Sequence, residues 1–197
     1  MLREYAPLAS SPLQPGCGFS SPSQALPERV TLDNPAIDVM TDLKCVSAVV
    51  IRPKDTVEEA KHRMLQRSVR LLLVLDHARR IDGLITATDT LGEKPMRVVA
   101  ERGCLHEEVL VRDVMTPQSL LEVLNMKDVL RSRVGHIVAT LEQAGRQHAV
   151  VVEYDERRMQ TVRGLFSLSQ IVRQLGAAIQ TSEVARTFSE IEAALAH

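Results

Sequence analysis

Short aliphatic runs and longer amphipathic stretches alternate along most of this chain. Runs dominated by Val, Leu and Ile predict buried strands, and in the first half they lie at residues 48–51, 71–75 and 81–85. The polar residues 76–80 separate the last two runs, which predicts a turn between two strands. The pattern indicates a mixed α/β chain with short strands.

A helix is predicted between the first two strands. Thr56 and Glu59 have the spacing of a capping box, in which the Thr side chain accepts from a first-turn amide and the Glu side chain reaches back. The following residues place four hydrophobic side chains at the i, i+3, i+7, i+8 spacing of one helix face. These side chains are Val57, Ala60, Met64 and Leu65. A second, shorter helix is predicted from Thr86.

The second half of the chain repeats this order. Asp38–Thr41 and Asp113–Thr116 have the same sequence, Asp-Val-Met-Thr, and each ends a short helical pattern. We expect the two Met residues to pack between this segment and the sheet. The elements expected after the second copy are a strand at 121–124, a helix ending at Gly145, strands at 148–152 and 161–166, and a helix at 167–175. The unit is therefore strand, helix, strand, strand, helix, present at 36–94 and again at 111–178.

Three segments lie outside the two repeats. Residues 1–35 hold six of the nine prolines, and we expect them to form a flexible tail. Residues 95–110 form a linker, in which Pro95 and Gly103 predict the first and last positions of a short helix. A last helix is predicted within residues 179–197, where it packs against its own domain or against a helix of a second copy. Its hydrophobic positions are Val184, Phe188, Ile191 and Leu195.

Composition narrows the class of protein. The 197 residues include three Phe, two Tyr and no Trp, and Lys+Arg (24) balances Asp+Glu (25). Single-strand binders need aromatic stacking and duplex binders a basic excess, so we expect no nucleic-acid partner. The longest aliphatic run, 71–75, is far shorter than the roughly 20 residues of a membrane span. No secretory signal is visible, so we expect a soluble cytoplasmic protein without a membrane partner.

Candidate chemistry is sparse. The six His and three Cys residues show neither the spacing of metal ligands nor a nucleophile beside a base. The sequence therefore predicts no metal site, no required cofactor and no enzyme active site.

The repeated unit resembles the CBS (cystathionine beta-synthase) domain. The resemblance covers about residues 36–176 and rests on the order of elements, the paired Asp-Val-Met-Thr segments and a closing Gly-hydrophobic-hydrophobic-Thr/Ser. That closing motif is Gly83–Thr86 in the first repeat and Gly164–Ser167 in the second. The resemblance implies an α/β fold of two β-α-β-β-α units packed as a pseudo-two-fold pair, with adenosyl-ligand clefts. It also implies that pairs associate as homodimers, and that the module regulates.

The same resemblance implies a nucleotide site in the first repeat. Thr86 and Asp89 match the family's Thr/Ser-x-x-Asp, in which the carboxylate accepts hydrogen bonds from ribose hydroxyls. The same spacing is also that of a helix capping box, and the two roles are compatible. Arg70 is the first choice for a phosphate contact, against the alternative of a solvated Arg. The aliphatic walls for adenine would be Val49, Val69, Leu71 and Leu84, each of which also fits plain core packing.

The second repeat departs from the family's motif. Gln170 stands where the family has Asp or Asn, three residues after Ser167. We interpret Ser-x-x-Gln as a capping box, and we expect this second cleft to bind weakly or not at all.

Two functions from different classes follow. The first is a regulatory module that senses an adenine nucleotide (AMP, ADP or ATP) in the first-repeat cleft and responds by a change of conformation or assembly. The second is a ligand-free dimerisation or adaptor module that regulates a partner protein. Both predict a homodimer.

Overall fold

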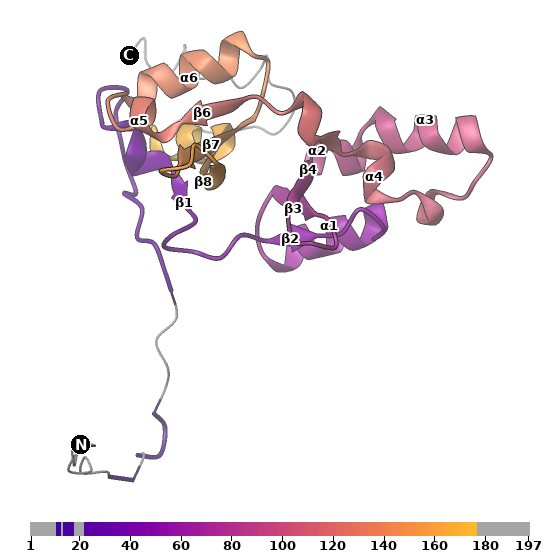
Figure 1. Cartoon of the computed structure of the whole chain (residues 1–197), viewed down its shortest axis with the longest axis horizontal. Helices are drawn as coiled ribbons and strands as arrows, with labels where there is room; N and C mark the ends of the chain where they lie inside the picture. Colours follow the sequence, from indigo (N-terminus) through magenta and orange to yellow (C-terminus); the bar gives the residue numbers. More distant parts are fainter. Residues whose placement is uncertain (1–10, 13, 18–21, 177–197) are drawn as a thin grey trace.

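The computed structural model describes residues 11–12, 14–17 and 22–176 and shows two units side by side (Figure 1). The helix predicted within residues 179–197 lies outside the described residues. Both units combine a four-stranded sheet with helices. The predicted α/β fold with two similar units is confirmed.

The sheet of the first unit has the order β2-β3-β4-β5. Its strands are β2 (Val50–Ile51), β3 (Leu71–Leu75), β4 (Ile81–Thr86) and β5 (Thr116–Pro117). β2 pairs with β3 in parallel, whereas β3–β4 and β4–β5 are antiparallel. The aliphatic run of β3 is buried along most of its length because it occupies a central position in the sheet.

The sheet of the second unit has the same topology. Its strands are β6 (Val123–Asn125), β7 (His148–Tyr154), β8 (Gln160–Ser167) and β1 (Thr41–Asp42), in the order β6-β7-β8-β1. β6 and β7 are parallel, and the other two pairs are antiparallel. The two sheets therefore match strand for strand.

The two repeats exchange their first strands. β1, from the first Asp-Val-Met-Thr copy, pairs with β8 of the second unit, and β5, from the second copy, pairs with β4 of the first unit. A glycine in each receiving strand allows the close approach. A Cβ on Gly164 would lie 2.7 Å from Met40 Sδ, and one on Gly83 would lie 3.2 Å from Met115 Sδ. Neither sheet is complete without a segment of the other repeat.

Helices cover both sheets. Those of the first unit are α1 (Val57–Gln66), α2 (Ala87–Leu91), α3 (Glu93–Arg102), η2 (His106–Glu108) and α4 (Val111–Val114). Those of the second are η1 (Ala36–Val39), α5 (Met126–Val129), α6 (Val134–Gln143) and α7 (Leu168–Gln174), while η3 (Gln118–Leu120) lies beside β4 of the first. Thr56 caps α1 through the predicted capping box, and Gly145 follows α6 with a φ of +60°. A left-handed residue after a helix is commonly Gly because it lacks a Cβ.

Two details differ from the sequence predictions. Leu65, expected on the buried face of α1, is 71% exposed because it lies one position beyond the stripe formed by Val57, Ala60 and Met64. α3 begins at Glu93, which makes Pro95 its third residue; a proline is still tolerated there because first-turn amides lack helical acceptors. The predicted end of α3 at Gly103 is confirmed.

Buried hydrophobic residues form three clusters. One fills each unit beneath its helices, and the third lies between the units. This third cluster joins Leu71, Leu73 and Leu84 of the first sheet to Val150 and Val152 of the second. Burial of five such side chains at about 25 cal/mol per Å² holds the two units together.

Residues 24–34 lie against the second unit rather than forming the predicted flexible tail. The Gln24 side chain donates to Met40 O (2.9 Å) and accepts from Asp42 N (2.8 Å). It therefore binds the backbone on both sides of Thr41. Val30 N donates to Gln174 O (2.9 Å), and Val30 itself is buried. Low hydrophobicity alone therefore did not decide the state of this segment, because specific backbone hydrogen bonds order it.

Within the described ranges, no helix is both long enough and apolar enough to cross a membrane.

Candidate ligand site at the boundary between the repeats

Thr86 and Asp89 form one compact polar group at the end of β4. Thr86 N and Oγ1 both donate to Asp89 Oδ2, at 2.9 and 2.7 Å, and Asp89 N contacts Thr86 Oγ1 at 3.4 Å. The predicted capping box is therefore present, and it holds the Asp89 carboxylate in one orientation. Asp89 is only 8% exposed, so its charge requires a partner.

Lys94 supplies that charge partner. Its Nζ lies 2.5 Å from Asp89 Oδ1 and 3.2 Å from the carbonyl oxygen of Val114. It comes from α3, and Val114 ends α4, so three elements meet at this carboxylate. The sequence analysis missed Lys94, because a separation of five residues matches no helical or capping pattern when a Gly intervenes at 92.

Arg70 stands directly before β3, next to the same region. The amide of Ala87, which opens α2, donates to the carbonyl oxygen of Arg70 (2.9 Å). In the second unit the amide of Leu168 donates in the same way to Gln147 (2.9 Å). Gln147 is therefore the structural counterpart of Arg70. Arg70 is exposed, and its guanidinium has no ion pair or hydrogen bond with the described residues.

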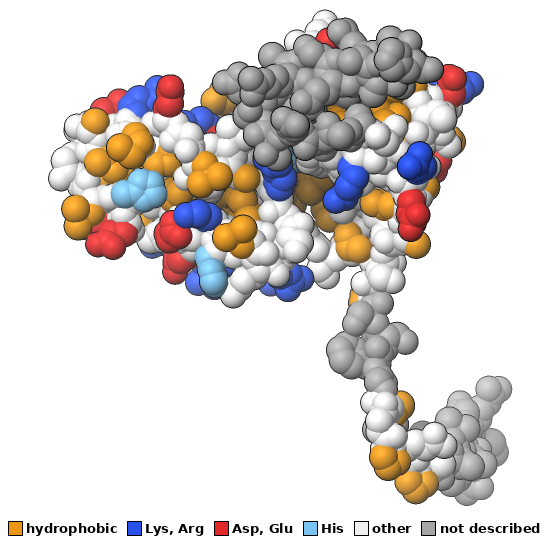
Figure 2. Space-filling view, turned by 180° about the vertical axis from the view of Figure 1, so that it is seen from behind, with side chains coloured by type: hydrophobic (Ala, Val, Ile, Leu, Met, Phe, Trp, Pro, Cys, Tyr) orange, Lys and Arg blue, Asp and Glu red, His pale blue; other side chains and the backbone are white. Residues whose placement is uncertain are grey.

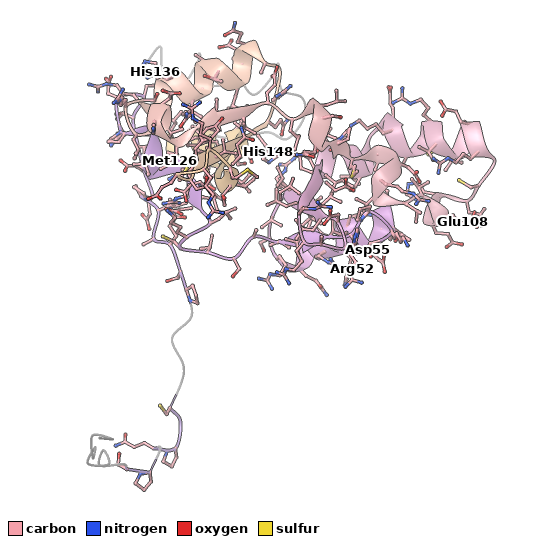
Figure 3. All side chains as sticks on the ribbon, viewed as in Figure 1. Arg52, Asp55, Glu108, Met126, His136 and His148 are labelled. Carbon is pink, nitrogen blue, oxygen red and sulfur yellow. The ribbon has the colours of Figure 1, made fainter. Side chains whose placement is uncertain are left out.

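His148 opens β7 of the second unit, within electrostatic reach of Arg70 and Asp89. Leu71 pairs with Thr86 and His148 pairs with Ser167, so His148 occupies the position that Leu71 has in the first unit. Burial lowers the pKa of His148 to about 4; the charge of Arg70 lowers it further, and the charge of Asp89 opposes this. The ring is thus neutral at neutral pH. Figure 3 shows His148 near the boundary between the two units.

The four aliphatic candidates divide into two sets. Val49 and Val69 pack against the core of the first unit, whereas Leu71 and Leu84 belong to the cluster between the units. Each therefore has a packing role, and the structure does not bring all four to one surface. An adenine contact for any of them stays a prediction.

The family model of the CBS domain matches residues 36–94. This first unit is therefore similar to the CBS domain. The second unit has the same sheet topology as the matched first unit and a similar closing motif. The sequence matches none of the curated proteins with which it was compared.

A solved structure with a TM-score above 0.5 shares the fold, and others are similar at lower scores. An uncharacterised conserved protein of Pyrococcus horikoshii is 20% identical, with a TM-score of 0.53, over 78% of this chain and 100% of the other. The CBS-pair protein CBSX2 from Arabidopsis thaliana is 20% identical, with a TM-score of 0.47, over 72% and 93%. CBSX2 in complex with AMP gives 18% identity, a TM-score of 0.48, and 72% and 94% coverage.

The second CBS-like unit lacks an equivalent polar group. Ser167 makes no capping hydrogen bond, so the capping box predicted from Ser-x-x-Gln is wrong. Its Oγ lies instead 3.0 Å from Ser169 Oγ. The longer Gln170 side chain points elsewhere, donating to Val39 O (3.4 Å) and to Gln174 Oε1 (3.3 Å). These contacts leave the second unit without a carboxylate at this position.

Among the residues that the structure describes, no three His, Cys, Asp or Glu side chains are grouped to hold a metal ion. The polar group around Asp89 contains a carboxylate, a hydroxyl and cationic side chains, which suits recognition of a polar anion by hydrogen bonds.

Proposed function

We propose that this protein is a regulatory CBS-pair module that binds an adenine nucleotide (AMP, ADP or ATP) next to Thr86 and Asp89. The observation that carries the proposal is the buried Asp89 carboxylate, which Thr86 holds in place at the start of α2. When Lys94 turns to the ligand, the Oδ1 atom of Asp89 can accept from the vicinal ribose hydroxyls, and charged acceptors form the stronger hydrogen bonds.

The charges around Asp89 favour a ligand with phosphate groups. Lys94 neutralises Asp89 in the ion pair, and Arg70 adds a positive charge that no described residue balances. The group therefore carries one net positive charge, from two cations and one anion. A guanidinium is well suited to phosphate because its N–H groups form a planar fork.

Regulation would follow from the place of the site. Thr86 and Asp89 belong to one unit, while His148 of the other lies within electrostatic reach of Asp89. A ligand here would contact both units and change the free energy of their packing. Such switching requires that the nucleotide bind one arrangement of the units more tightly than another.

The proposal is tested by calorimetry with AMP, ADP and ATP on the full chain, preceded by a thermal-shift screen that adds cyclic dinucleotides and S-adenosylmethionine. A ligand that binds only the native state raises the melting temperature. Asp89→Asn keeps the shape of the side chain and removes its charge, and we expect at least a tenfold loss of affinity. Asp128→Asn, at an exposed position on α5, is the matched control and should bind as the unchanged protein does.

Unchanged binding by Asp89→Asn would place the nucleotide elsewhere. A flat thermal-shift screen, with no binding of AMP, ADP or ATP in the calorimeter, would reject the nucleotide proposal altogether.

A second candidate is a ligand-free dimerisation or adaptor module, and exposed hydrophobic side chains favour it. Leu65 of α1, Leu91 of α2 and Met96 of α3 are 71%, 70% and 62% exposed. Figure 2 shows hydrophobic side chains gathered over the surface of the first unit. Analytical ultracentrifugation of the unchanged protein and of the double variant Leu65→Ser/Leu91→Ser measures whether the protein dimerises through this surface. A dimer that the double variant disrupts, together with a flat ligand screen, would support the adaptor.

A further inference from the structure

Residues 22–29 form a strap along the second unit that side-chain amides hold in place. Figure 1 shows this stretch, in indigo, running beside the second unit before the chain reaches η1. Within the described part of the chain, its hydrogen bonds to the second unit involve two glutamine side chains. Gln24 binds the backbone on both sides of Thr41, and Gln174 Nε2 donates to the carbonyl oxygen of Pro27 (2.7 Å). Gln174 is only 5% exposed, and a buried amide of this kind is normally hydrogen-bonded. The strap therefore depends on two side chains rather than on backbone pairing.

The residues that follow the strap are held differently. Val30 is buried, and Gly135 N of α6 donates to the backbone carbonyl oxygen of Leu32 (2.9 Å). By contrast, six of the eight residues in 22–29 are exposed. Segments with few buried contacts open at the lowest cost in free energy. Residues 22–29 can therefore detach as a unit while Val30 and the residues after it stay on the second unit.

The strap is attached beside the place in the second unit that corresponds to the candidate ligand group of the first. In the first unit Lys94 joins Asp89 to the carbonyl oxygen of Val114. The repeated motifs make Gln170 the counterpart of Asp89 and Val39 the counterpart of Val114. Gln170 Nε2 donates to Val39 O (3.4 Å), so the same two positions meet in both units. We call the pair of Gln170 and Val39 the second position.

Contacts of the strap lie on both sides of the second position. On one side Gln170 Nε2 also lies 3.3 Å from Gln174 Oε1, and Gln174 in turn holds Pro27. On the other side Gln24 donates to Met40 O (2.9 Å), which is the next carbonyl oxygen after that of the second position. The strap is thus anchored both to α7 and to the segment that leads into β1. The stretch between these two anchors spans the second position.

We propose that residues 22–29 are an autoinhibitory strap, which closes the second position to a nucleotide until the strap detaches. This inference rests on the proposed nucleotide site, because the second position is the equivalent of that site. Gln170 keeps the chemistry to bind: its Oε1 accepts no hydrogen bond from the described residues, and an amide oxygen can accept one from a ribose hydroxyl. The apparent affinity of the second position is reduced in proportion to the fraction of chains whose strap is detached.

The experiment is calorimetry with ATP on the full chain, for the unchanged protein and for the double variant Gln24→Ala/Gln174→Leu. The double variant removes the side-chain hydrogen bonds that hold the strap. Leucine fills the buried space of Gln174, and the backbone oxygen at that position still accepts from Val30 N. We expect one ATP per unchanged chain, bound at the first unit, and two ATP per chain of the double variant. The affinity of the first ATP should be the same in both proteins.

Hydrogen–deuterium exchange measures directly whether the strap has detached. The Asp42 amide donates to Gln24 Oε1 (2.8 Å). We expect this amide to exchange about tenfold faster in the double variant, because the loss of one hydrogen bond shifts a local opening equilibrium by about that factor. Exchange in β7 and β8 should stay unchanged, which would show that the second sheet remains folded.

A second variant leaves the buried Gln174 intact. Gln24→Ala alone changes a half-buried residue of the strap, so the fold should be retained. We expect faster exchange at Asp42 and a second ATP that binds more weakly than in the double variant, because Gln174 still holds Pro27. Gln143→Ala, at an exposed position of α6, is the matched control and should bind one ATP with exchange unchanged.

The outcomes distinguish the strap from the nucleotide site. Fast exchange at Asp42 with only one bound ATP in the double variant would overturn the role of the strap while the nucleotide site stands. Two ATP bound per unchanged chain would overturn it as well. Exchange at Asp42 that is equally slow in both proteins would also overturn it, because the two glutamines would then not hold the strap. Failure of every protein to bind ATP, ADP and AMP would overturn both proposals.

Discussion

Lys94 Nζ lies 2.5 Å from Asp89 Oδ1, and this ion pair ties α3 to the start of α2. The Asp89 side chain is 10% exposed and that of Lys94 is 42% exposed, so the pair lies at the edge of the buried region. Lys94 can therefore turn towards a ligand without being drawn out of a core. It balances the carboxylate in the free protein and adds positive charge for a phosphate.

The first prediction concerns this lysine. Lys94→Met removes the charge and keeps the aliphatic stem, so we expect nucleotide affinity to fall. The loss should grow from AMP to ADP to ATP, because each added phosphate increases the attraction to a nearby cation. Calorimetry with the three nucleotides measures it. Lys127→Met, at an exposed position of α5, is the control; an equal loss for all three nucleotides would contradict a charge effect.

The second prediction concerns the buried pair of Asp42 and Arg163. Both side chains are nearly buried, at 12% and 13% exposure. Asp42 comes from the first repeat and Arg163 from the second, and Arg163 also contacts Glu153 at 3.2 Å. Arg163→Met leaves the Asp42 charge without its cation, and we expect a loss of about 3 kcal/mol in the free energy of unfolding.

Urea denaturation measures that loss. The double variant Arg163→Met/Asp42→Asn should recover part of it, because the unpaired charge is gone. Arg157→Met, in the exposed turn between β7 and β8, should change stability by less than about 0.5 kcal/mol. A single Arg163→Met variant as stable as the unchanged protein would show that the pair does not hold β1 in the second sheet.

The third prediction tests the exchange of strands through glycine. In Gly164→Ala the added Cβ would lie 2.7 Å from Met40 Sδ and 2.8 Å from Thr41 O. The second contact is with backbone, so β1 must move, and we expect a loss of about 1–3 kcal/mol. Gly135→Ala is the control, since its Cβ would meet Leu32 O at 3.4 Å inside α6, where Ala is the better helix former. The melting temperatures of Gly164→Ala and Gly135→Ala measure this effect. Equal melting temperatures would contradict the close approach of β1 to Gly164.

The fourth prediction concerns acid stability. The pKa of His148 is lowered to about 4 in the folded protein, from an ordinary value of 6.5. Between these values the unfolded chain takes up a proton that the folded chain does not, so the free energy of unfolding falls as the pH drops from 6.5 to 4. We expect the free energy of unfolding to fall by about 2–3 kcal/mol over this pH range because of His148.

Urea denaturation of the unchanged protein and of His148→Leu across pH 4–7.5 isolates this contribution. The variant should lose less stability over that range. The pKa of Asp113 is also lowered, by its hydrogen bond from Arg102 against the opposing effect of burial, but that group acts in both proteins and cancels. Parallel curves for the two proteins would show that His148 stays hydrated when folded.

Local patterns in the sequence predicted local structure well. The capping boxes at Thr56 and Thr86 are present because each depends only on residues three positions apart. The same spacing at Ser167 failed, since the Gln170 side chain is long enough to reach η1 and does so. A short-range pattern therefore determines a helix start only when no long-range acceptor competes for its side chain.

The composition of residues 1–35 predicted local structure less well than the capping patterns did. Its prolines and serines predicted a flexible segment, whereas Gln24 and Val30 attach it to the second unit. Those contacts depend on the unpaired backbone edge of β1 and on the end of α7, neither of which a local composition can show.

The sequence by itself determined the duplicated order of strands and helices, because hydrophobic period and capping act over a few residues. The CBS-like pairing of the two units was implied by the resemblance to that family. Only the tertiary structure decided that the repeats exchange β1 and β5, that Lys94 balances Asp89, and that burial lowers the pKa of His148. These relationships join residues that are adjacent in space through strand pairing and unit packing. Their energies depend on distance and burial, which no spacing along the chain encodes.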